Sequence, residues 1–170
     1  MESFILSWNH KVVNHVNEIK LSERLCAICE RLLPNKILAD IGTDHAYLPS
    51  YAYLKGIIPC AIGTDVNEGP YESARTHVNN LGLSQVIDIR LGDGLAVIRE
   101  NEVEQVTIAG MGGALITSIL EDGKAKLAGV ERLILQPNVA TDKVRRWLYA
   151  NDWTICDECI LEEDQIIYEI

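Results

Sequence analysis

The stretch LADIGTDHAYLP, residues 38–49, decides the fold. It begins as a short apolar run and passes through Gly42 into charged and aromatic residues. A buried strand that turns at a glycine and leads into a helix is typical of the first unit of an α/β sheet. Asp40, Asp44 and His45 stand at this turn, where a nucleotide-binding loop ordinarily has small residues. Two carboxylates and an imidazole at the end of a core strand indicate a binding or catalytic site.

Short apolar segments alternate with helical segments on the carboxyl side of this stretch. The expected strands are residues 36–40, 60–65, 86–92, 105–110 and 132–137, and the expected helices between and after them are 47–55, 69–81, 113–121 and 141–150. A further helix is expected from Ser22, as its cap, to about Leu33, before Pro34. Strand and helix in alternation predict a parallel sheet with helices on both faces.

The last part of the chain differs from this alternation. Residues 153–163 and 165–170 are two strand-like runs separated only by a tight turn, which predicts an antiparallel hairpin. The predicted fold is therefore Rossmann-like α/β, with a mostly parallel seven-stranded sheet and a terminal antiparallel hairpin.

The length and composition are those of one domain. The chain has 170 residues, 48% of them hydrophobic and 24% charged. Residues 1–20 lack a clear period and are expected to form an arm or extension, and residues 21–170 form the domain. No apolar run is long enough to span a membrane, and the first residues make a poor secretory signal. We therefore expect a cytoplasmic protein without a membrane partner.

The net charge of −10 argues against loose, sequence-blind binding to nucleic acid through a broad basic surface. Local basic clusters remain at Lys143, Arg145 and Arg146 and at Lys124 and Lys126. Each cluster is either a solvated helix face or a set of phosphate contacts.

Two CxxC pairs are the candidates for a metal site. Cys26 and Cys29 lie in an expected helix, and Cys156 and Cys159 lie in an expected strand. Zinc knuckles need turns rich in glycine or proline, and neither pair has one. We expect reduced thiols and no metal.

The tetrapeptide IGTD occurs at 41–44 and again at 62–65, each time at the end of an expected strand. Open α/β sheets bind ligands at these carboxyl ends. Gly42 supplies the tight turn of a Rossmann-type site, and Asp65 supplies the acid that accepts hydrogen bonds from ribose. The usual G-x-G-x-x-G is missing, because Asp44 stands where the second glycine would be.

This departure predicts the kind of cofactor. Asp40 and Asp44 would repel a pyrophosphate, whereas S-adenosylmethionine carries an ammonium and a sulfonium and no phosphate. Asp40 would orient its amino-acid end, Asp65 its ribose and Asp93 its adenine. The candidate cofactor-binding residues are Asp40, Gly42, Thr43, Asp65, Val66, Asp93, Gly94 and Gly110. The alternative is that the aspartates only cap helices at these turns.

Four segments, DIGTDHAYLP (40–49), NEGPYESA (67–74), IAGMGG (108–113) and ERLILQPN (131–138), resemble the TrmK family of bacterial tRNA (adenine(22)-N1)-methyltransferases. The resemblance covers about residues 21–170. It implies a class I methyltransferase domain that uses S-adenosylmethionine and methylates N1 of an adenine in tRNA. Family members usually carry a further C-terminal helical region. The sequence ends at Ile170, which we interpret as a truncated chain or a short member.

The methylated adenine gains positive charge, which a nearby carboxylate would stabilise. The candidate catalytic residues are Asp44, His45 and Asn138, and the candidate substrate-binding residues are Tyr47, Met111, Gly112, Gly113, Lys143, Arg145 and Arg146. Tyr47 would stack on the base, and the glycines would let backbone approach it. The alternatives are that Asp44 or Asn138 caps a helix and that His45 only packs.

Two other functions fit the same residues. One is a methyltransferase of the same fold that acts on a small molecule, and the other is a non-catalytic module that binds the cofactor or RNA. Transfer of a labelled methyl group to unmodified tRNA separates them from the leading interpretation. We expect a monomer or a weak homodimer with tRNA as its partner.

Overall fold

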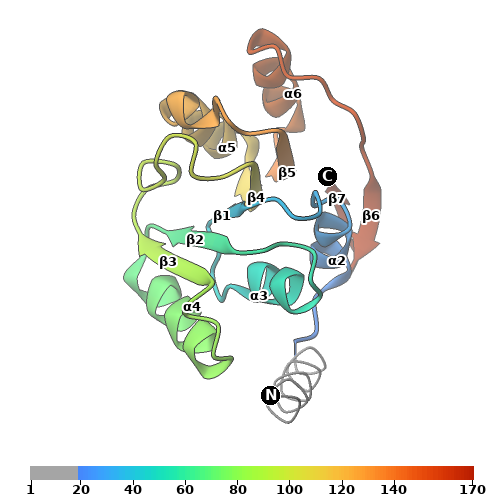
Figure 1. Cartoon of the computed structure of the whole chain (residues 1–170). Coiled ribbons are helices and arrows are strands. Elements are labelled where there is room, and N and C mark those ends of the chain that lie inside the picture. Colours follow the sequence, from blue (N-terminus) through green and yellow to red (C-terminus); the bar gives the residue numbers. More distant parts are fainter. Residues whose placement is uncertain (1–18) are drawn as a thin grey trace.

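The computed structural model describes residues 19–170, and its centre is a parallel sheet (Figure 1). The strands of this sheet are β1 (Leu38–Ile41), β2 (Ala61–Asp65), β3 (Ile87–Leu91), β4 (Gln105–Gly112) and β5 (Arg132–Val139). Within the described residues they lie in the order β3-β2-β1-β4-β5, and every neighbouring pair is parallel. The predicted N-terminal arm, residues 1–20, lies almost wholly outside the described residues.

Helices cover both faces of the sheet, as the alternation predicted (Figure 1). The helices are α2 (Glu23–Cys29), α3 (Tyr47–Leu54), α4 (Glu68–Asn80), α5 (Gly113–Asp122) and α6 (Thr141–Ala150), with a short 3-10 turn at Lys124–Leu127. One hydrophobic core joins β1 to α2, α3 and α4 through residues such as Ile28 and Leu48. A second core joins the other face to α5 and α6 through residues such as Ile116 and Val144. The Rossmann-like α/β fold is therefore confirmed.

The first described helix is shorter than predicted. Ser22 caps it as expected, because its hydroxyl accepts from the Leu25 amide at 3.2 Å. The helix ends at Cys29 rather than near Leu33. The reason lies in the buried side chain of Gln105, which accepts from the Leu33 amide at 2.7 Å and donates to the Leu33 carbonyl at 3.0 Å. These bonds direct the chain out of the helix and toward β1.

The hairpin forms, but it does not extend the sheet to seven strands. Its strands β6 (Ile160–Glu163) and β7 (Ile166–Glu169) pair only with each other and make a separate two-stranded sheet. The turn between them uses Asp164 and Gln165 at φ 52° and 65°, a combination typical of the tight hairpin turns that match strand twist. The seven-stranded sheet was therefore wrong, although β7 lies beside β5.

Residues 153–159 were predicted as the start of the hairpin and form no strand. Their charged side chains bind elsewhere: Asp157 pairs with Arg31 at 2.9 Å, and Glu158 pairs with Arg145 at 2.6 Å. A hollow of about 750 Å³ lies between this segment and β5. The ion pairs hold the segment across the hollow, so it does not form a ladder along the edge of the sheet.

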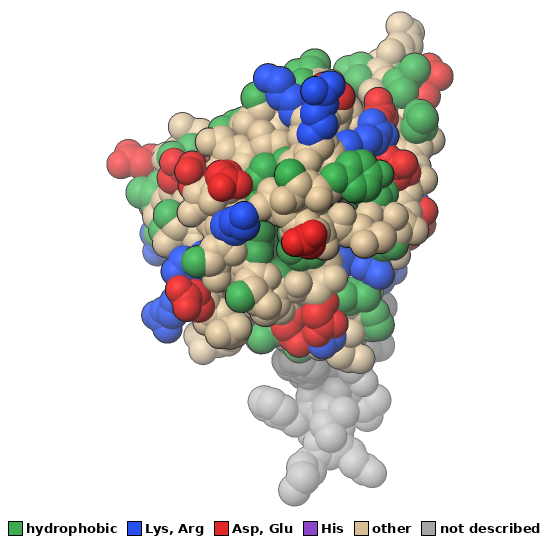
Figure 2. All heavy atoms as spheres, turned by 90° about the horizontal axis from the view of Figure 1, so that it is seen from above, with side chains coloured by type: hydrophobic (Ala, Val, Ile, Leu, Met, Phe, Trp, Pro, Cys, Tyr) green, Lys and Arg blue, Asp and Glu red, His purple; other side chains and the backbone are tan. Residues whose placement is uncertain are grey.

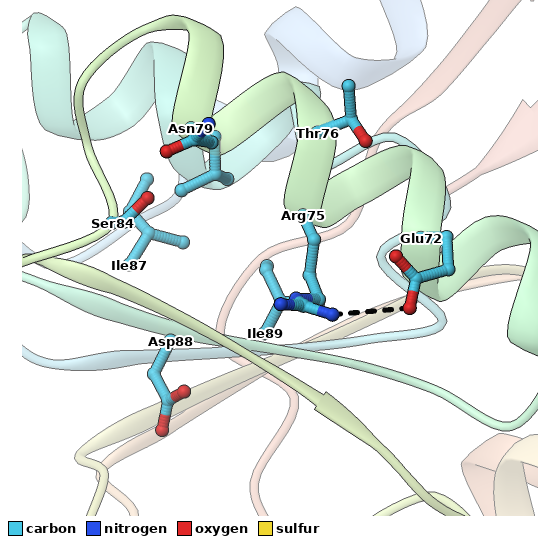
Figure 3. Close-up of a pocket in the computed structure, with 9 residues that line it drawn as sticks. Glu72, Arg75, Thr76, Asn79, Ser84, Ile87, Asp88 and Ile89 are labelled. Atoms are coloured by element: carbon cyan, nitrogen blue, oxygen red, sulfur yellow. Dashed lines mark hydrogen bonds and ion pairs between the residues drawn. The ribbon is translucent and has the colours of Figure 1, made fainter.

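A second hollow, of about 500 Å³, lies between α4 and β3 (Figure 3). It is lined by the later part of α4, where Glu72 and Arg75 pair at 3.2 Å, and by the first residues of β3. It is therefore away from the carboxyl end of β3. Across residues 19–170 we find no helix with the length and apolar character needed to cross a membrane.

Candidate active site at the carboxyl edge of the sheet

The carboxyl ends of all five parallel strands lie along one edge of the sheet. The strand order reverses between β1 and β4, because β2 and β3 follow on one side of β1 while β4 and β5 follow on the other. Open α/β sheets bind their ligands in the crevice at such a switch point. The loops that follow β1 and β4 therefore form the centre of the candidate site.

Gly42 makes the turn at the end of β1 possible. Its φ of +72° is a left-handed conformation that glycine adopts without strain. The amides of Gly42 and Thr43 both donate to the Thr64 carbonyl, at 2.8 and 2.9 Å. A Cβ on Gly42 would come within 2.3 Å of the Met111 Cε. The β1 loop and the β4 loop are thus in direct contact at the switch point.

Asp40 is buried beneath this turn, with 7% of its surface exposed. Its carboxylate accepts from the hydroxyls of Thr43 at 2.7 Å and Thr107 at 2.5 Å. Burial raises the pKa of Asp40, and the two hydroxyls and the charge of Arg24 oppose that rise. The carboxylate is bonded to the loop itself, so it would act on a ligand through Thr43 and the backbone.

Asp65 ends β2 in a similarly protected position, with 8% exposed. One carboxylate oxygen accepts from the Asn67 amide at 3.0 Å, which fixes the turn into α4. Within residues 19–170 its other oxygen accepts no hydrogen bond, and it remains available to a hydroxyl of a ligand. Val66 beside it is 60% exposed.

The loop after β3 brings a third acid to the edge. Asp93 is exposed and Gly94 is buried with φ 52°. The Gly94 carbonyl accepts from the Thr64 hydroxyl at 3.3 Å, which ties this loop to the end of β2. The ends of β1, β2 and β3 therefore each carry an aspartate along one edge.

Asp44 and His45 lie farther out on the β1 loop. Asp44 has φ 53° and an exposed side chain, and its Oδ1 lies 3.7 Å from the His45 Nε2. The cap position of α3 is held by Ala46 with no side-chain hydrogen bond, so Asp44 does not cap this helix. The His45 ring stacks on Tyr47 at 5.3 Å, and Tyr47 meets His77 edge-on at 4.8 Å. An exposed carboxylate therefore stands beside a row of three rings.

His77 is the inner member of that row, and no pattern in the sequence points to it. Burial and the neighbouring His45 lower the pKa of His77, which favours the neutral imidazole. The outer ring, His45, has 46% of its side chain exposed, so the row ends at the surface.

A bulge in β4 shapes the opposite side of the crevice. The register of β4 against β5 shifts around Gly110, which has φ +75°. Its amide donates to the Gln136 Oε1 at 3.0 Å, and its carbonyl accepts from the Asn138 Nδ2 at 2.8 Å. The side chains of β5 thus replace the ladder bonds that the bulge breaks.

Both polar atoms of the Asn138 side chain form hydrogen bonds within the protein. Its Nδ2 donates to the Gly110 carbonyl, and its Oδ1 accepts from the Gln136 Nε2 at 3.0 Å. It does not cap α6, whose cap position is Ala140 with no side-chain bond. The side chain remains exposed. The capping alternative was therefore wrong, and contact with a substrate base stays a prediction.

Gly112 and Gly113 follow the bulge. A Cβ on Gly113 would lie 2.2 Å from the Ala140 carbonyl oxygen, so this buried glycine lets α5 pack against the start of α6. That packing accounts for Gly113 without a substrate. Gly112 and Met111 are partly exposed, and their contact with substrate stays a prediction.

The three cations of α6 have different surroundings. Arg145 is bonded to Glu158 and to Glu169, at 2.6 and 3.1 Å, and so ties α6 to the hairpin. Arg146 is 82% exposed and pairs with Asp142 at 3.3 Å, and Lys143 is exposed. Figure 2 shows basic and acidic side chains interspersed on one face of the molecule. Lys143 and Arg146 are better placed than Arg145 for phosphate contacts.

Among the described residues, no three His, Cys, Asp or Glu side chains converge on a position that would hold an ion. Cys26 and Cys29 lie on α2 as predicted, and burial raises the pKa of Cys29 to about 11. Cys156 is exposed outside any strand.

Comparison with known proteins identifies the family of the chain. The family model described as "TrmK: tRNA (adenine(22)-N(1))-methyltransferase" matches residues 38–170. The chain belongs to the TrmK family. The curated tRNA (adenine(22)-N(1))-methyltransferase of Bacillus subtilis is 50% identical over 155 residues, which are 91% of this chain and 65% of that protein.

Solved structures agree with the TrmK assignment. The crystal structure of the B. subtilis m1A22 tRNA methyltransferase TrmK has a TM-score of 0.87 and 51% identity, covering 89% of this chain and 64% of that one. The Streptococcus pneumoniae protein Sp1610, solved in complex with S-adenosyl-L-methionine, has a TM-score of 0.86 and 48% identity, covering 88% and 71%. This chain therefore spans about two thirds of the length of these TrmK relatives.

Besides His77, two residues of this candidate site were not found by sequence reasoning. Arg24 of α2 donates from Nη1 to the Gln136 Oε1 at 2.8 Å, and the Gln136 side chain is fully buried. Gln136 lies at the end of an expected strand, so the position was visible and its role was not. Arg24 lies on a helix well before the motifs, and nothing in the local sequence relates it to them.

Proposed function

We propose that this chain is the methyltransferase part of a tRNA (adenine(22)-N1)-methyltransferase, with residues 21–170 as its domain. Membership of the TrmK family supports the reaction and the substrate. The observation that carries the proposal is the row of aspartates at the carboxyl ends of β1, β2 and β3, beside the switch point. Such an edge suits a cationic methyl donor and repels a pyrophosphate.

The chemistry of these residues fits S-adenosylmethionine, which supplies an activated methyl group when bound. Asp65 has a carboxylate oxygen free for a ribose hydroxyl. Asp93 would accept from the exocyclic amine of the adenine ring. Asp40 would act on the amino group through Thr43, whose hydroxyl it holds at 2.7 Å. Gly42 and Gly110 let backbone approach the ligand, because both have a positive φ.

Asp44 would serve the target base. The N1 atom of adenine is largely unprotonated at neutral pH, so the barrier is lowered mainly by positioning. Positive charge develops on the purine during transfer, and the exposed Asp44 carboxylate would stabilise that charge or accept a proton from the exocyclic amine. Tyr47 and His45 would stack on the base after it leaves its own stack in the tRNA.

The partners follow from the substrate. We propose tRNA as the macromolecular partner, with Lys143 and Arg146 of α6 on its phosphates, and the cytoplasm as the place of action. A monomer or weak homodimer is our proposal for the oligomeric state. The mixed charges of the surface imply that shape and a few local contacts select the tRNA.

The test is transfer of a labelled methyl group to an unmodified tRNA with adenine at position 22, followed by mapping of the label. A matched tRNA with guanine at that position is the control. Our proposal predicts label at N1 of that adenine and none in the control. Label at another position, or in a small molecule only, would contradict it. Cofactor binding without turnover would support the non-catalytic alternative instead.

A further inference from the structure

Arg90 ties together the loop that carries Asp93. This loop, residues 92–102, leads from β3 toward β4 and contains no helix or strand. Arg90 is the next to last residue of β3, and its Nη1 donates to the Val97 carbonyl at 2.7 Å, in the middle of the loop. The same guanidinium donates to both carboxylate oxygens of Glu102 at 2.7 and 2.8 Å, at the end of the loop. One side chain therefore joins the start, the middle and the end of the loop.

The pair of Arg90 and Glu102, which we call the clamp, is shielded from solvent. The two side chains are 21% and 20% exposed. Glu102 also accepts from the Arg99 amide at 2.7 Å, and the Arg90 Nε donates to Asp88 at 2.8 Å. A guanidinium that bonds a carboxylate through two N–H groups is fixed in direction as well as in distance. The clamp therefore restrains the backbone of the loop.

The restraint reaches Asp93 through the packing of the loop. A Cβ on Gly92 would collide with the Val97 side chain, so the middle of the loop packs on the residue before Asp93. The Asp93 carbonyl accepts from the Ala96 amide at 3.0 Å, and Ile98 is buried in the core. The Asp93 side chain itself is exposed. The loop thus presents one carboxylate to solvent on a backbone that is fixed on both sides.

We propose that Arg90 is a positioning residue for the adenine of S-adenosylmethionine, because the clamp holds the Asp93 carboxylate where it accepts from the exocyclic amine. The inference rests on the proposed function and deepens it, since it assigns selectivity for adenine to a residue that acts through the loop. A hydrogen bond weakens steeply when its atoms leave their preferred distance and angle. A carboxylate on a loop without regular structure therefore needs support from its neighbours.

The clamp should affect one part of the ligand only. The two acids at the ends of β1 and β2 are held by other bonds: the hydroxyls of Thr43 and Thr107 donate to Asp40, and the Asn67 amide donates to Asp65. Loss of the clamp leaves these bonds in place. The contacts proposed for the amino-acid end and the ribose should therefore persist when the contact with the adenine amine is weakened.

The experiment is calorimetric titration of the chain with S-adenosylhomocysteine and with S-inosylhomocysteine, in which an oxygen replaces the exocyclic amine of the purine. Both ligands are titrated into the wild type, Arg90→Gln and the matched control Arg75→Gln, an arginine of α4 whose ion pair is exposed. We expect the wild type to bind S-adenosylhomocysteine about 10- to 100-fold more tightly than S-inosylhomocysteine, the range for a hydrogen bond to a charged group. In Arg90→Gln this preference should fall to about three-fold or less, because only the affinity for S-adenosylhomocysteine falls. Arg75→Gln should keep the wild-type preference.

The variant Asp93→Ala separates action through the loop from a direct effect of the Arg90 charge. If Arg90 acts through Asp93, adding Arg90→Gln to Asp93→Ala should change the affinity for either ligand by no more than about two-fold. Additive losses in the double variant would show that Arg90 acts independently of Asp93 and would overturn the inference.

Equal loss of both ligands in Arg90→Gln would show a general structural role and overturn the inference, while the proposed function would stand. A full wild-type preference in Arg90→Gln, or a wild type that does not prefer S-adenosylhomocysteine, would also overturn it. If Arg90→Gln fails to fold, Glu102→Gln is titrated in its place, because it removes the charge of the other half of the clamp, and the same selective loss supports the inference. A wild type that binds neither ligand would contradict the proposed function itself.

Discussion

At the residue scale, Asp44 is the acid whose role can be separated from the fold. It is exposed, it caps no helix and it carries no buried contact. We expect Asp44→Ala to lower kcat about 100-fold at saturating cofactor and tRNA, because a carboxylate beside the base contributes roughly that much. Cofactor affinity should not change. Labelled methyl transfer measures the first quantity and calorimetry the second.

The matched control for Asp44 is Asp122→Asn, which removes a charge from the far end of α5. Its turnover should equal that of the wild type. If Asp44→Ala kept the full turnover of the wild type, the proposal that the Asp44 carboxylate stabilises charge on the target base would be contradicted.

Gly42 supports a second prediction at this scale. Alanine at φ +72° is strained, and its Cβ would displace the Met111 side chain. We expect Gly42→Ala to lower the free energy of unfolding by about 1–2 kcal/mol, as measured by urea denaturation.

Gly56→Ala is the control. Gly56 has a similar φ of +69°, but no atom lies within 4 Å of the new Cβ, so this variant measures the backbone strain alone. If Gly42→Ala lowers the free energy of unfolding more than Gly56→Ala does, the difference measures the clash with Met111. In a Met111→Ala background this difference should disappear. A Gly42→Ala variant as stable as the wild type would contradict the described turn.

At the element scale, the hairpin and α2 depend on each other through Glu163. Its carboxylate satisfies two amides at the start of the helix, beside the Ser22 cap. We expect Glu163→Ala to lower the free energy of unfolding by about 1 kcal/mol, the usual effect of losing a helix cap. Glu162→Ala, at the preceding and exposed residue of β6, is the control and should be close to neutral. A larger loss at Glu162 would contradict the contact.

The ion pair between Arg90 of β3 and Glu102 predicts a pH dependence. Hydrogen bonds from the Arg90 guanidinium lower the pKa of the Glu102 carboxyl from its ordinary 4.5 to about 2. A depressed pKa means that the stabilisation is complete above about pH 4.5 and is lost as the pH falls toward 2. The stability difference between wild type and Glu102→Gln should therefore be about 1 kcal/mol near neutral pH, after allowance for solvent screening, and should shrink in acid.

Urea denaturation across this pH range tests the point. Glu100→Gln, on the same loop and outside the pair, is the control and should show no difference at either pH. A Glu102→Gln difference that stays constant into acid would contradict the ion pair.

At the scale of the whole molecule, the net charge of −10 would govern how the proposed tRNA partner is bound. We propose phosphate contacts for two cations, Lys143 and Arg146, so little counterion release would accompany binding. We expect the logarithm of the tRNA association constant to fall with the logarithm of salt concentration with a slope of only about −2. Fluorescence anisotropy at several salt concentrations measures this slope, and a slope near −6 would show a basic surface absent from this account.

The sequence predicted the local architecture well and the long-range contacts poorly. The five strands and the helices after them follow from runs of apolar residues and turn glycines, which are local signals. The shorter first helix depends on Gln105, and the separate hairpin depends on ion pairs with Arg31 and Arg145. Those partners are far apart in the sequence, so no local pattern reveals them.

The candidate site shows the same division. The aspartates at the ends of β1, β2 and β3 were predicted to share an edge, because parallel strands place their carboxyl ends together. The roles of Gln136 and Arg24 depend on contacts between β5, the β4 bulge and α2. Such contacts require the tertiary structure.

The central claim is that the acidic carboxyl edge accepts a methyl donor and rejects a pyrophosphate. Calorimetry of the wild type and Asp65→Asn with S-adenosylhomocysteine and with NAD tests it most directly. We predict that the wild type binds S-adenosylhomocysteine and not NAD, and that Asp65→Asn weakens the binding of S-adenosylhomocysteine about ten-fold. Binding of NAD without binding of S-adenosylhomocysteine would contradict it.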